Sequence, residues 1–430
     1  MNTLSLVFLL ALGLSLGIQL WLALRQRRHV AVHRDRVPDA FAERISLEAH
    51  QKAADYTLSN TRMDILELFF GALLLLGWTL GGGLDWLDGQ WRALARDLDW
   101  GPIPTGVMVI FSMTLISAVL DLPFNVYRTF RIEQKFGFNR TTPGLFISDL
   151  IKQTLLMSAI GLPLLWLVLW LMQGAGEYWW LYVWGVWTAF SLFMMWAYPA
   201  FIAPLFNKFE PLDDADLKQR IEQLLERCGF TSKGVFVMDG SRRSSHGNAY
   251  FTGLGDNKRI VFFDTLLKSL NADEVEAVLA HELGHFRRKH IRKRLIAMAV
   301  LSLLSLALLG GLMQYDAFYT GLGVSQPSTY IALTLFMLVA PLFSIYLQPV
   351  FAWVSRKHEF EADDFAARHS DAQNLNRALV KLYEENASTL TPDPLYSAFH
   401  DSHPPASVRI AHLSAKLANG PDSMEKSDVA

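Results

Sequence analysis

The sequence is poor in cysteine and in charged residues, and each shortage excludes a class of protein. Its 430 residues include one cysteine, Cys228, which rules out an internal disulfide and a cysteine-rich zinc site. Only 19% of the residues are charged and the formal net charge is -2, so the chain lacks the basic surface that a nucleic-acid partner requires. Hydrophobic residues make up 51% of the chain instead, with 13 Trp and 28 Phe.

The apolar residues are clustered in about seven stretches, and crossing a bilayer takes roughly 20 such residues. The stretches predict a mainly α, multi-pass membrane protein rather than a soluble protein with buried apolar helices. The third stretch is short and should extend into its polar flanks. The first should be a retained helix rather than a removed signal peptide, because no clear cleavage site follows it. The expected spans are Leu4–Leu24, Ile65–Leu87, Val107–Leu120, Leu150–Met172, Tyr178–Ile202, Leu295–Met313 and Tyr330–Val354.

Basic residues alternate between the connecting segments. Lys and Arg are frequent after the first, third, fifth and seventh spans, whereas residues 173–177 and 314–329 contain none. Because basic residues stay on the cytoplasmic side, this pattern predicts an external N-terminus and a cytoplasmic location for both long polar segments and the C-terminus. The chain then divides into spans 1 to 5 (1–205), a first polar segment (206–294), spans 6 and 7 (295–354) and a second polar segment (355–430).

The first polar segment contains the pattern His281-Glu282-Leu-Gly-His285 on a predicted helix, with Asn271 and Glu274 as its capping box. Two histidines four residues apart share one helix face and can bind one metal ion, and the glutamate between them can act as general base on a metal-activated water. This is the H-E-x-x-H pattern of zinc peptidases. The surrounding elements predict a small α+β, zincin-like catalytic region, with a helix at Ala215–Arg227 and strands at 234–238, 249–252 and 259–264.

A catalytic zinc site needs a third protein ligand, and Glu359 in the second polar segment is the natural candidate. Asp363 lies four residues on, shares its helix face and can accept a hydrogen bond from the far nitrogen of a ligand histidine. Glu361 has Phe365 in the corresponding place and lacks such a partner. Weaker rivals for the third ligand are His358, His369 and His400.

Substrate alignment can come from residues outside the ligand set. Asn248 starts a predicted strand that also contains Tyr250, and this strand can pair with an extended peptide by edge addition. His403, beside two prolines, can stabilise the oxyanion. Spacing alone favours a structural turn at Ser402–Pro405, so the role of His403 stays open at this point.

Taken together, these motifs resemble those of the Ste24-type CaaX prenyl proteases, which are integral-membrane zinc peptidases of the gluzincin clan. The resemblance spans nearly all the chain, including the number of spans. The matching stretches are FGFNRTTPG (136–144), IAPLFNKF (202–209), GSRRSSHGNAYFTG (240–253), NKRIVFFDTLL (257–267), HELGH (281–285), SRKHEFEADDFA (355–366) and SHPP (402–405) with Arg409.

The resemblance implies one zinc ion held by His281, His285 and Glu359, with Glu282 catalytic and Asp363 beside the ligands. It also implies that Asn248 and His403 flank the reacting carbonyl and that Arg409 helps to hold the substrate. In this family the seven helices enclose the site in a large chamber.

The expected reaction is hydrolysis of a peptide bond in a peptide or membrane-protein substrate, prenylated or not, at the face of a lipid bilayer. Eukaryotic relatives remove the last three residues of prenylated CaaX proteins. The compact loops and the absence of an ER-retrieval signal favour a bacterial inner-membrane homologue, with the ER membrane as the location if the source is eukaryotic. The alternatives are an HtpX-type quality-control peptidase and a non-enzymatic membrane chaperone, channel or scaffold with a structural zinc. A structural site would use four protein ligands and would not need Glu282.

Overall fold

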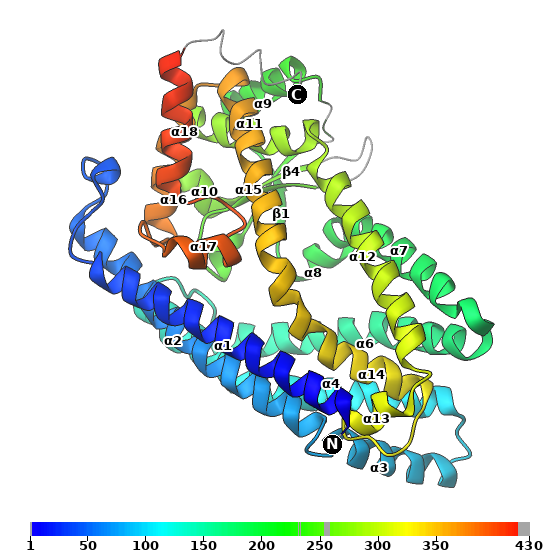
Figure 1. The fold of residues 1–430 in the computed structure, drawn as a ribbon. Coiled ribbons are helices and arrows are strands. Elements are labelled where there is room, and N and C mark those ends of the chain that lie inside the picture. Colours follow the sequence, from blue (N-terminus) through cyan, green and yellow to red (C-terminus); the bar gives the residue numbers. More distant parts are fainter. Residues whose placement is uncertain (1, 231, 233, 253–258, 420–430) are drawn as a thin grey trace.

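Helices dominate the computed structural model, which describes residues 2–230, 232, 234–252 and 259–419 (Figure 1). Within these residues six helical stretches are long and apolar enough to cross a membrane, and a bent pair of helices makes a seventh. The six are α1 (Thr3–Val32), α4 with its continuation (102–136), α6 (Pro143–Gly174), α7 with its flanking turns (176–206), α12 (His290–Leu312) and α14 through α15 (329–369). The prediction of a mainly α membrane protein with about seven spans is confirmed.

The second predicted span, Ile65–Leu87, is interrupted by a break that the prediction missed. Helix α2 (Leu47–Trp78) starts earlier and stops sooner, and the chain then bends by 48° into α3 (Gly83–Asp97). Gly82 has a φ of 77° at this bend, which glycine adopts without a steric penalty. Hydropathy alone did not detect the break because the residues on both sides of it are apolar.

The third predicted span, Val107–Leu120, extends well beyond its apolar stretch, as expected. Helix α4 (Pro102–Tyr127) continues through a π-helical turn (Arg128–Glu133) into α5 (Gln134–Phe136). Charged residues line this continuation, so the helix leaves the apolar region before it ends. The helix therefore reaches from the membrane-spanning part towards the catalytic part.

The spanning helices pack as sequential neighbours. Helix α1 contacts α2, α4 contacts α6, α6 contacts α7, α7 contacts α12, and α14 (Thr329–Val339) returns to α4. At the end of the bundle near the N-terminus, Tyr330 donates a 2.7 Å hydrogen bond to Asp88. Gly106 permits this packing, because a Cβ there would lie 2.5 Å from the Tyr330 side chain.

The catalytic region is a four-stranded sheet covered by helices at the other end of the bundle (Figure 1). The strand order is β1-β2-β4-β3, with β2 parallel to β4 and both outer pairs antiparallel. Strand β3 is therefore an edge strand. The bounds are β1 (Phe209–Pro211), β2 (Val235–Met238), β3 (Ala249–Thr252), β4 (Arg259–Phe263), α8 (Ala203–Phe206), α9 (Ala215–Arg227), α10 (Asp264–Ser269), α11 (Ala272–Arg287), α16 (Ala372–Glu385), α17 (Pro394–His400) and α18 (Ala406–Asn419).

Several local predictions are confirmed in this region. Helix α9 has the predicted bounds, and the strands at 249–252 and 259–264 are present as β3 and β4. Helix α11 begins with the predicted capping box, in which Asn271 accepts from the Glu274 amide and Glu274 accepts from the Asn271 amide. Its apolar face packs in one core with β4, α9 and α16.

Helix α15 (Ser344–His369) connects the membrane-spanning and catalytic parts without a break. It follows α14 and a 3-10 turn (Ala340–Phe343), so the predicted helix running on from the last span is confirmed. Glu359 therefore stands on a helix that is rooted among the spanning helices. Its position depends on how those helices pack.

A second connection between the membrane-spanning and catalytic parts lies at the π-helical end of α4. Phe138 stacks on His246, with ring centroids 4.3 Å apart, and the Arg140 amide donates to the Arg243 carbonyl at 3.0 Å. Tyr56 on α2 donates a 2.5 Å hydrogen bond to Glu133, whose other oxygen lies 3.5 Å from His246 Nε2. These contacts fix the loop before β3 to the spanning helices.

Candidate metal centre and active site

The H-E-x-x-H motif lies where α11 crosses α15. Gly284, within the motif, faces α15 so closely that a Cβ on it would lie 2.9 Å from Ala362 Cα and 3.0 Å from Phe365 Cβ. A larger residue would push the two helices apart. Gly284 thus allows the histidine face of α11 to approach Glu359.

His281, His285 and Glu359 bring their ligand atoms to one point. His281 Nε2 lies 3.2 Å from His285 Nε2 and 3.4 Å from Glu359 Oε2, and His285 Nε2 lies 3.3 Å from Glu359 Oε1. A tetrahedral zinc with bonds of about 2.0–2.1 Å needs ligand atoms about 3.3 Å apart. The three predicted ligands are therefore spaced as one metal ion requires.

The burial of Glu359 supports the same conclusion. Its side chain is 4% exposed, and only nitrogen atoms of basic side chains surround Oε2: His403 Nδ1 at 2.7 Å, His281 Nε2 at 3.4 Å and Arg409 Nη1 at 3.5 Å. A buried carboxylate is costly unless positive charge or hydrogen-bond donors compensate it. Two imidazoles and one carboxylate suit zinc, so the donor set fits a metal ion in this position.

Asp363 and Arg409 fix the orientation of His281 on the side of the ring that faces away from the metal position. Asp363 Oδ1 lies 2.9 Å from His281 Nδ1, so it accepts the proton of the nitrogen that faces away from the metal position. Arg409 donates to both oxygens of Asp363 at 2.9 and 2.5 Å, and all three side chains are buried. The Asp363 carboxylate is thereby neutralised and its orientation is fixed.

Reasoning from sequence missed the group that orients the second histidine. His285 Nδ1 lies 3.0 Å from His290 Nδ1, and His290 Nε2 donates to Glu361 Oε2 at 2.9 Å. With Nε2 of His285 directed at the metal, its Nδ1 carries the proton and donates to His290. Lys289, with a φ of 58°, turns the chain between α11 and α12 and brings His290 back to the motif. No rule of helical spacing reveals a partner beyond such a turn.

The weaker candidates for the third ligand lie outside the cluster. His358 stacks on His290 at a centroid distance of 3.9 Å, His369 stacks on Phe365, and His400 packs on Tyr396. In the described part of the chain, the one group of three His or acidic residues with converging ligand atoms is His281, His285 and Glu359.

His403 and Glu282 lie beside the ligands. His403 Nδ1 is 2.7 Å from Glu359 Oε2 while its side chain stays 61% exposed, so the imidazole borders the metal position from the solvent side. Glu282 is half-buried on α11 and has no hydrogen bond or ion pair among the described residues. Both side chains are available to a substrate.

Tyr250 belongs to the edge strand β3, whereas Asn248, predicted as its first residue, lies one residue before the strand begins. Asn248 is exposed, and its carbonyl accepts from the Phe263 amide at 3.0 Å. Phe251 packs on Phe286 of α11 with ring centroids 4.3 Å apart, which places β3 alongside the metal-binding helix. Burial and the neighbouring Tyr198 raise the pKa of Tyr250 to about 12, so its hydroxyl remains a donor at neutral pH.

Comparison with known proteins gives matches along most of the chain. A family model described as CAAX prenyl protease N-terminal, five membrane helices, matches residues 26–208, and the model for Peptidase family M48 matches residues 211–417. A CAAX prenyl protease 1 homolog of Arabidopsis thaliana is 38% identical over 89% of this chain and 92% of its own length. CAAX prenyl protease 1 of Saccharomyces cerevisiae is 40% identical over 70% of each chain. The crystal structure of S. mikatae Ste24p superimposes with a TM-score of 0.89, at 32% identity over 96% of this chain and 99% of that one.

A multi-pass helical bundle in which an H-E-x-x-H helix packs against a carboxylate from another helix defines an integral-membrane metallopeptidase. The chain belongs to peptidase family M48 and, within it, to the CaaX prenyl proteases. The predicted enzyme class and family are confirmed. These matches do not favour the quality-control peptidase or the non-enzymatic scaffold.

Proposed function

We propose that this chain is a zinc endopeptidase that cleaves C-terminal CaaX-type peptides in the membrane and releases the last three residues. The observation that carries the proposal is the convergence of His281, His285 and Glu359 at tetrahedral spacing. The curated relatives named CaaX prenyl proteases support the choice of substrate class.

We infer that His281, His285 and Glu359 hold one zinc ion per chain. When bound, zinc supplies Lewis-acid activation of a water molecule and of the scissile carbonyl. The remaining groups of the site act on the peptide and on protons. Asp363 and His290 keep the two imidazoles in the tautomer that directs Nε2 at the metal.

Glu282 takes the proton of the attacking water and passes it to the amine of the leaving peptide. His403 donates a hydrogen bond to the carbonyl oxygen as negative charge develops on it, which its exposed position beside Glu359 permits. Residues of β3 bind the substrate backbone by edge addition, with Asn248 and Tyr250 as side-chain donors. The contacts of Arg409 support a role in positioning Asp363, and the substrate contact implied by the resemblance stays a prediction.

We further propose that the catalytic region faces the cytoplasm and that the N-terminus lies outside. The start of α1 and the catalytic sheet lie at opposite ends of the helical bundle, which agrees with the predicted topology (Figure 1). The bacterial inner membrane remains the expected location. The chamber and the boundaries of the four predicted segments also stay predictions.

Incubation of purified wild type and Glu282→Gln with farnesylated and unfarnesylated CaaX peptides tests the proposal. Wild type should release the C-terminal tripeptide, detected by mass spectrometry, while Glu282→Gln should lose about 10³-fold in kcat/KM and keep its metal. The exposed Glu222→Gln on α9 is the matched control and should cleave at the wild-type rate.

Two results would contradict the proposal. Cleavage by Glu282→Gln at the wild-type rate would remove Glu282 from the mechanism. Cleavage at internal sites only, with the tripeptide left attached, would overturn the CaaX substrate class while leaving the peptidase assignment intact.

A further inference from the structure

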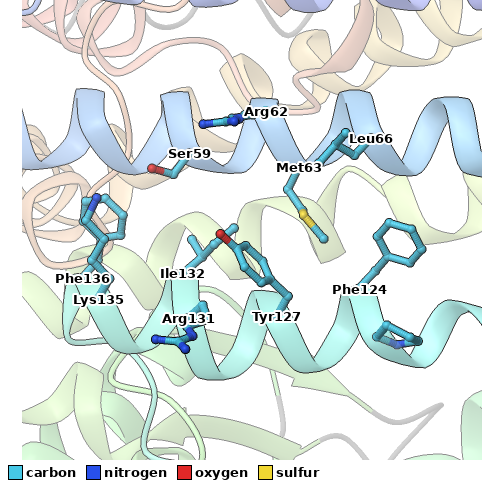
Figure 2. Close-up of a pocket in the computed structure, with 11 residues that line it drawn as sticks. Ser59, Arg62, Met63, Leu66, Phe124, Tyr127, Arg131, Ile132, Lys135 and Phe136 are labelled. Atoms are coloured by element: carbon cyan, nitrogen blue, oxygen red, sulfur yellow. The ribbon is translucent and has the colours of Figure 1, made fainter.

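A cavity of about 760 Å³ opens between α2 and the end of α4, away from the metal centre (Figure 2). Its two ends differ in chemistry. Ser59, Arg62, Arg131 and Lys135 line what we call the cationic end, and Met63, Leu66, Pro123 and Phe124 line the apolar end. Tyr127, Ile132 and Phe136 complete the wall.

The cavity lies at the boundary between polar and apolar sequence on both helices. Helix α2 is polar up to Asp64 and, apart from Glu67, apolar from Ile65 onwards, whereas α4 is apolar up to Leu120, carries Asp121, and is rich in charge from Arg128 into its continuation. In a membrane, such a transition marks the level of the lipid headgroups. The cationic end therefore lies at headgroup level, and the apolar end lies at acyl-chain level.

The acidic residues of α2 are on a different face from the cavity. Arg128 donates to Asn60, Asp64 and Glu67, which share a face of α2 about a third of a turn away from the cavity-lining residues. The α2 residues that line the cavity are Ser59, Arg62, Met63 and Leu66, so α2 contributes no carboxylate to its wall.

The basic residues of the cationic end have no acidic partner within ion-pair distance among the described residues. The neighbouring carboxylates are already engaged: Asp55 with Arg34, Asp64 and Glu67 with Arg128, and Glu133 with Tyr56 and His246. Three uncompensated positive charges at headgroup level attract an anion, and each basic residue near a membrane surface adds to that attraction.

We propose that this cavity binds one phospholipid with an anionic headgroup. The phosphate lies among the guanidinium and ammonium groups of the cationic end, and one acyl chain follows the apolar end. Charge complementarity selects the headgroup, and the polar-to-apolar gradient selects an amphiphile over a free ion.

Native mass spectrometry of the full-length protein, released from detergent with added phosphatidylglycerol or phosphatidylcholine, tests the proposal. Wild type should retain one phosphatidylglycerol at a concentration at least about tenfold below that needed for phosphatidylcholine. The variant Arg62→Gln/Arg131→Gln/Lys135→Gln should lose this preference. The matched control Arg28→Gln/Arg292→Gln/Arg294→Gln removes three exposed charges elsewhere and should change retention less than about twofold.

A second variant tests the apolar end without changing charge. Leu66→Trp narrows the cavity and should reduce retention of long-chain phosphatidylglycerol about fivefold or more. Unchanged retention in both cavity variants, or an equal loss in the charge control, would overturn the proposal. Displacement of the lipid by millimolar inorganic phosphate, or by a CaaX peptide, would also overturn it, because the cavity would then be an anion or substrate site.

Discussion

Positive charge is present at two helix–helix contacts of this molecule, which we call seams. It is buried and paired at the first seam, and exposed without an ion pair at the second. At the crossing of α11 and α15, Gly284 brings the helices into backbone contact, and Arg409 is buried with both oxygens of Asp363 as partners. At the seam of α2 and α4, a cavity of about 760 Å³ separates the helices, and Arg62 and Arg131 are exposed without an ion pair among the described residues.

The difference follows from desolvation. A buried charge must be paired within the protein, so the first seam is a closed network whose geometry is fixed. An exposed charge at headgroup level needs no internal partner and can recognise an external one. The first seam should therefore be sensitive to small changes, and the second should tolerate them structurally while its ligand preference changes.

The largest effect is expected from removal of the third ligand. Glu359→Ala should lower bound zinc, measured by inductively coupled plasma mass spectrometry, well below one per chain and abolish peptide cleavage, because two imidazoles alone leave the site incomplete. Glu361→Ala removes the nearby carboxylate that contacts His290 and should keep most of the metal. Equal metal loss in both variants would show that Glu359 is not the third ligand.

Breaking the buried charge pair should have the next largest effect. Asp363→Asn removes the negative charge that pairs with Arg409 and replaces one of the two acceptor oxygens with an amide donor, so it disrupts the hydrogen bonds to Arg409 and His281. Zinc affinity, measured by competition with a chelator, should fall about 10- to 100-fold. The control Asp364→Asn affects a carboxylate that pairs with His412 and Lys416 outside the site, and its zinc affinity should match wild type. A similar loss in both variants would refute a specific role of Asp363.

A smaller effect is expected from one methyl group at the crossing. Gly284→Ala places a Cβ 2.9 Å from Ala362 Cα, so the helices must move apart. This should lower the free energy of unfolding by about 1–3 kcal/mol. Thermal unfolding in detergent should register a lower Tm. Gly89→Ala in α3, where nothing lies within 4 Å of the added Cβ, is the matched control and should be neutral or slightly stabilising. An unchanged Tm for Gly284→Ala would show that the crossing can relax.

The smallest effect on stability is expected at the open seam. The triple glutamine variant of Arg62, Arg131 and Lys135 should change the free energy of unfolding by less than about 0.5 kcal/mol per site and leave the zinc content at one per chain. Thermal unfolding in a lipid-free detergent and metal analysis measure both quantities. A large loss of stability without lipid would mean that these residues support the fold, and the contrast between the two seams would disappear.

Much of the site was predictable because its chemistry lies in local spacing. His281 and His285 are four residues apart on one helix, and Glu359 and Asp363 repeat that spacing on another, so each pair shares a face. The capping box at Asn271 likewise needs only neighbouring residues. The apolar stretches identified the spanning helices but not their ends, because the α2–α3 break lies within an apolar stretch and α4 stays helical after its apolar stretch has ended.

The sequence by itself determined the H-E-x-x-H motif and the approximate number of spans, since the motif lies within five residues and each span within one apolar stretch. It also predicted Glu359 as the third ligand, from its spacing to Asp363. Only the tertiary structure decided that Arg409 pairs with Asp363, that His290 and Glu361 orient His285, and that a cationic cavity opens between α2 and α4. Most of these features join residues that are distant in sequence, and His290 reaches His285 only because the chain turns at Lys289. They form only when helix packing removes water from one seam and leaves the other open to its surroundings.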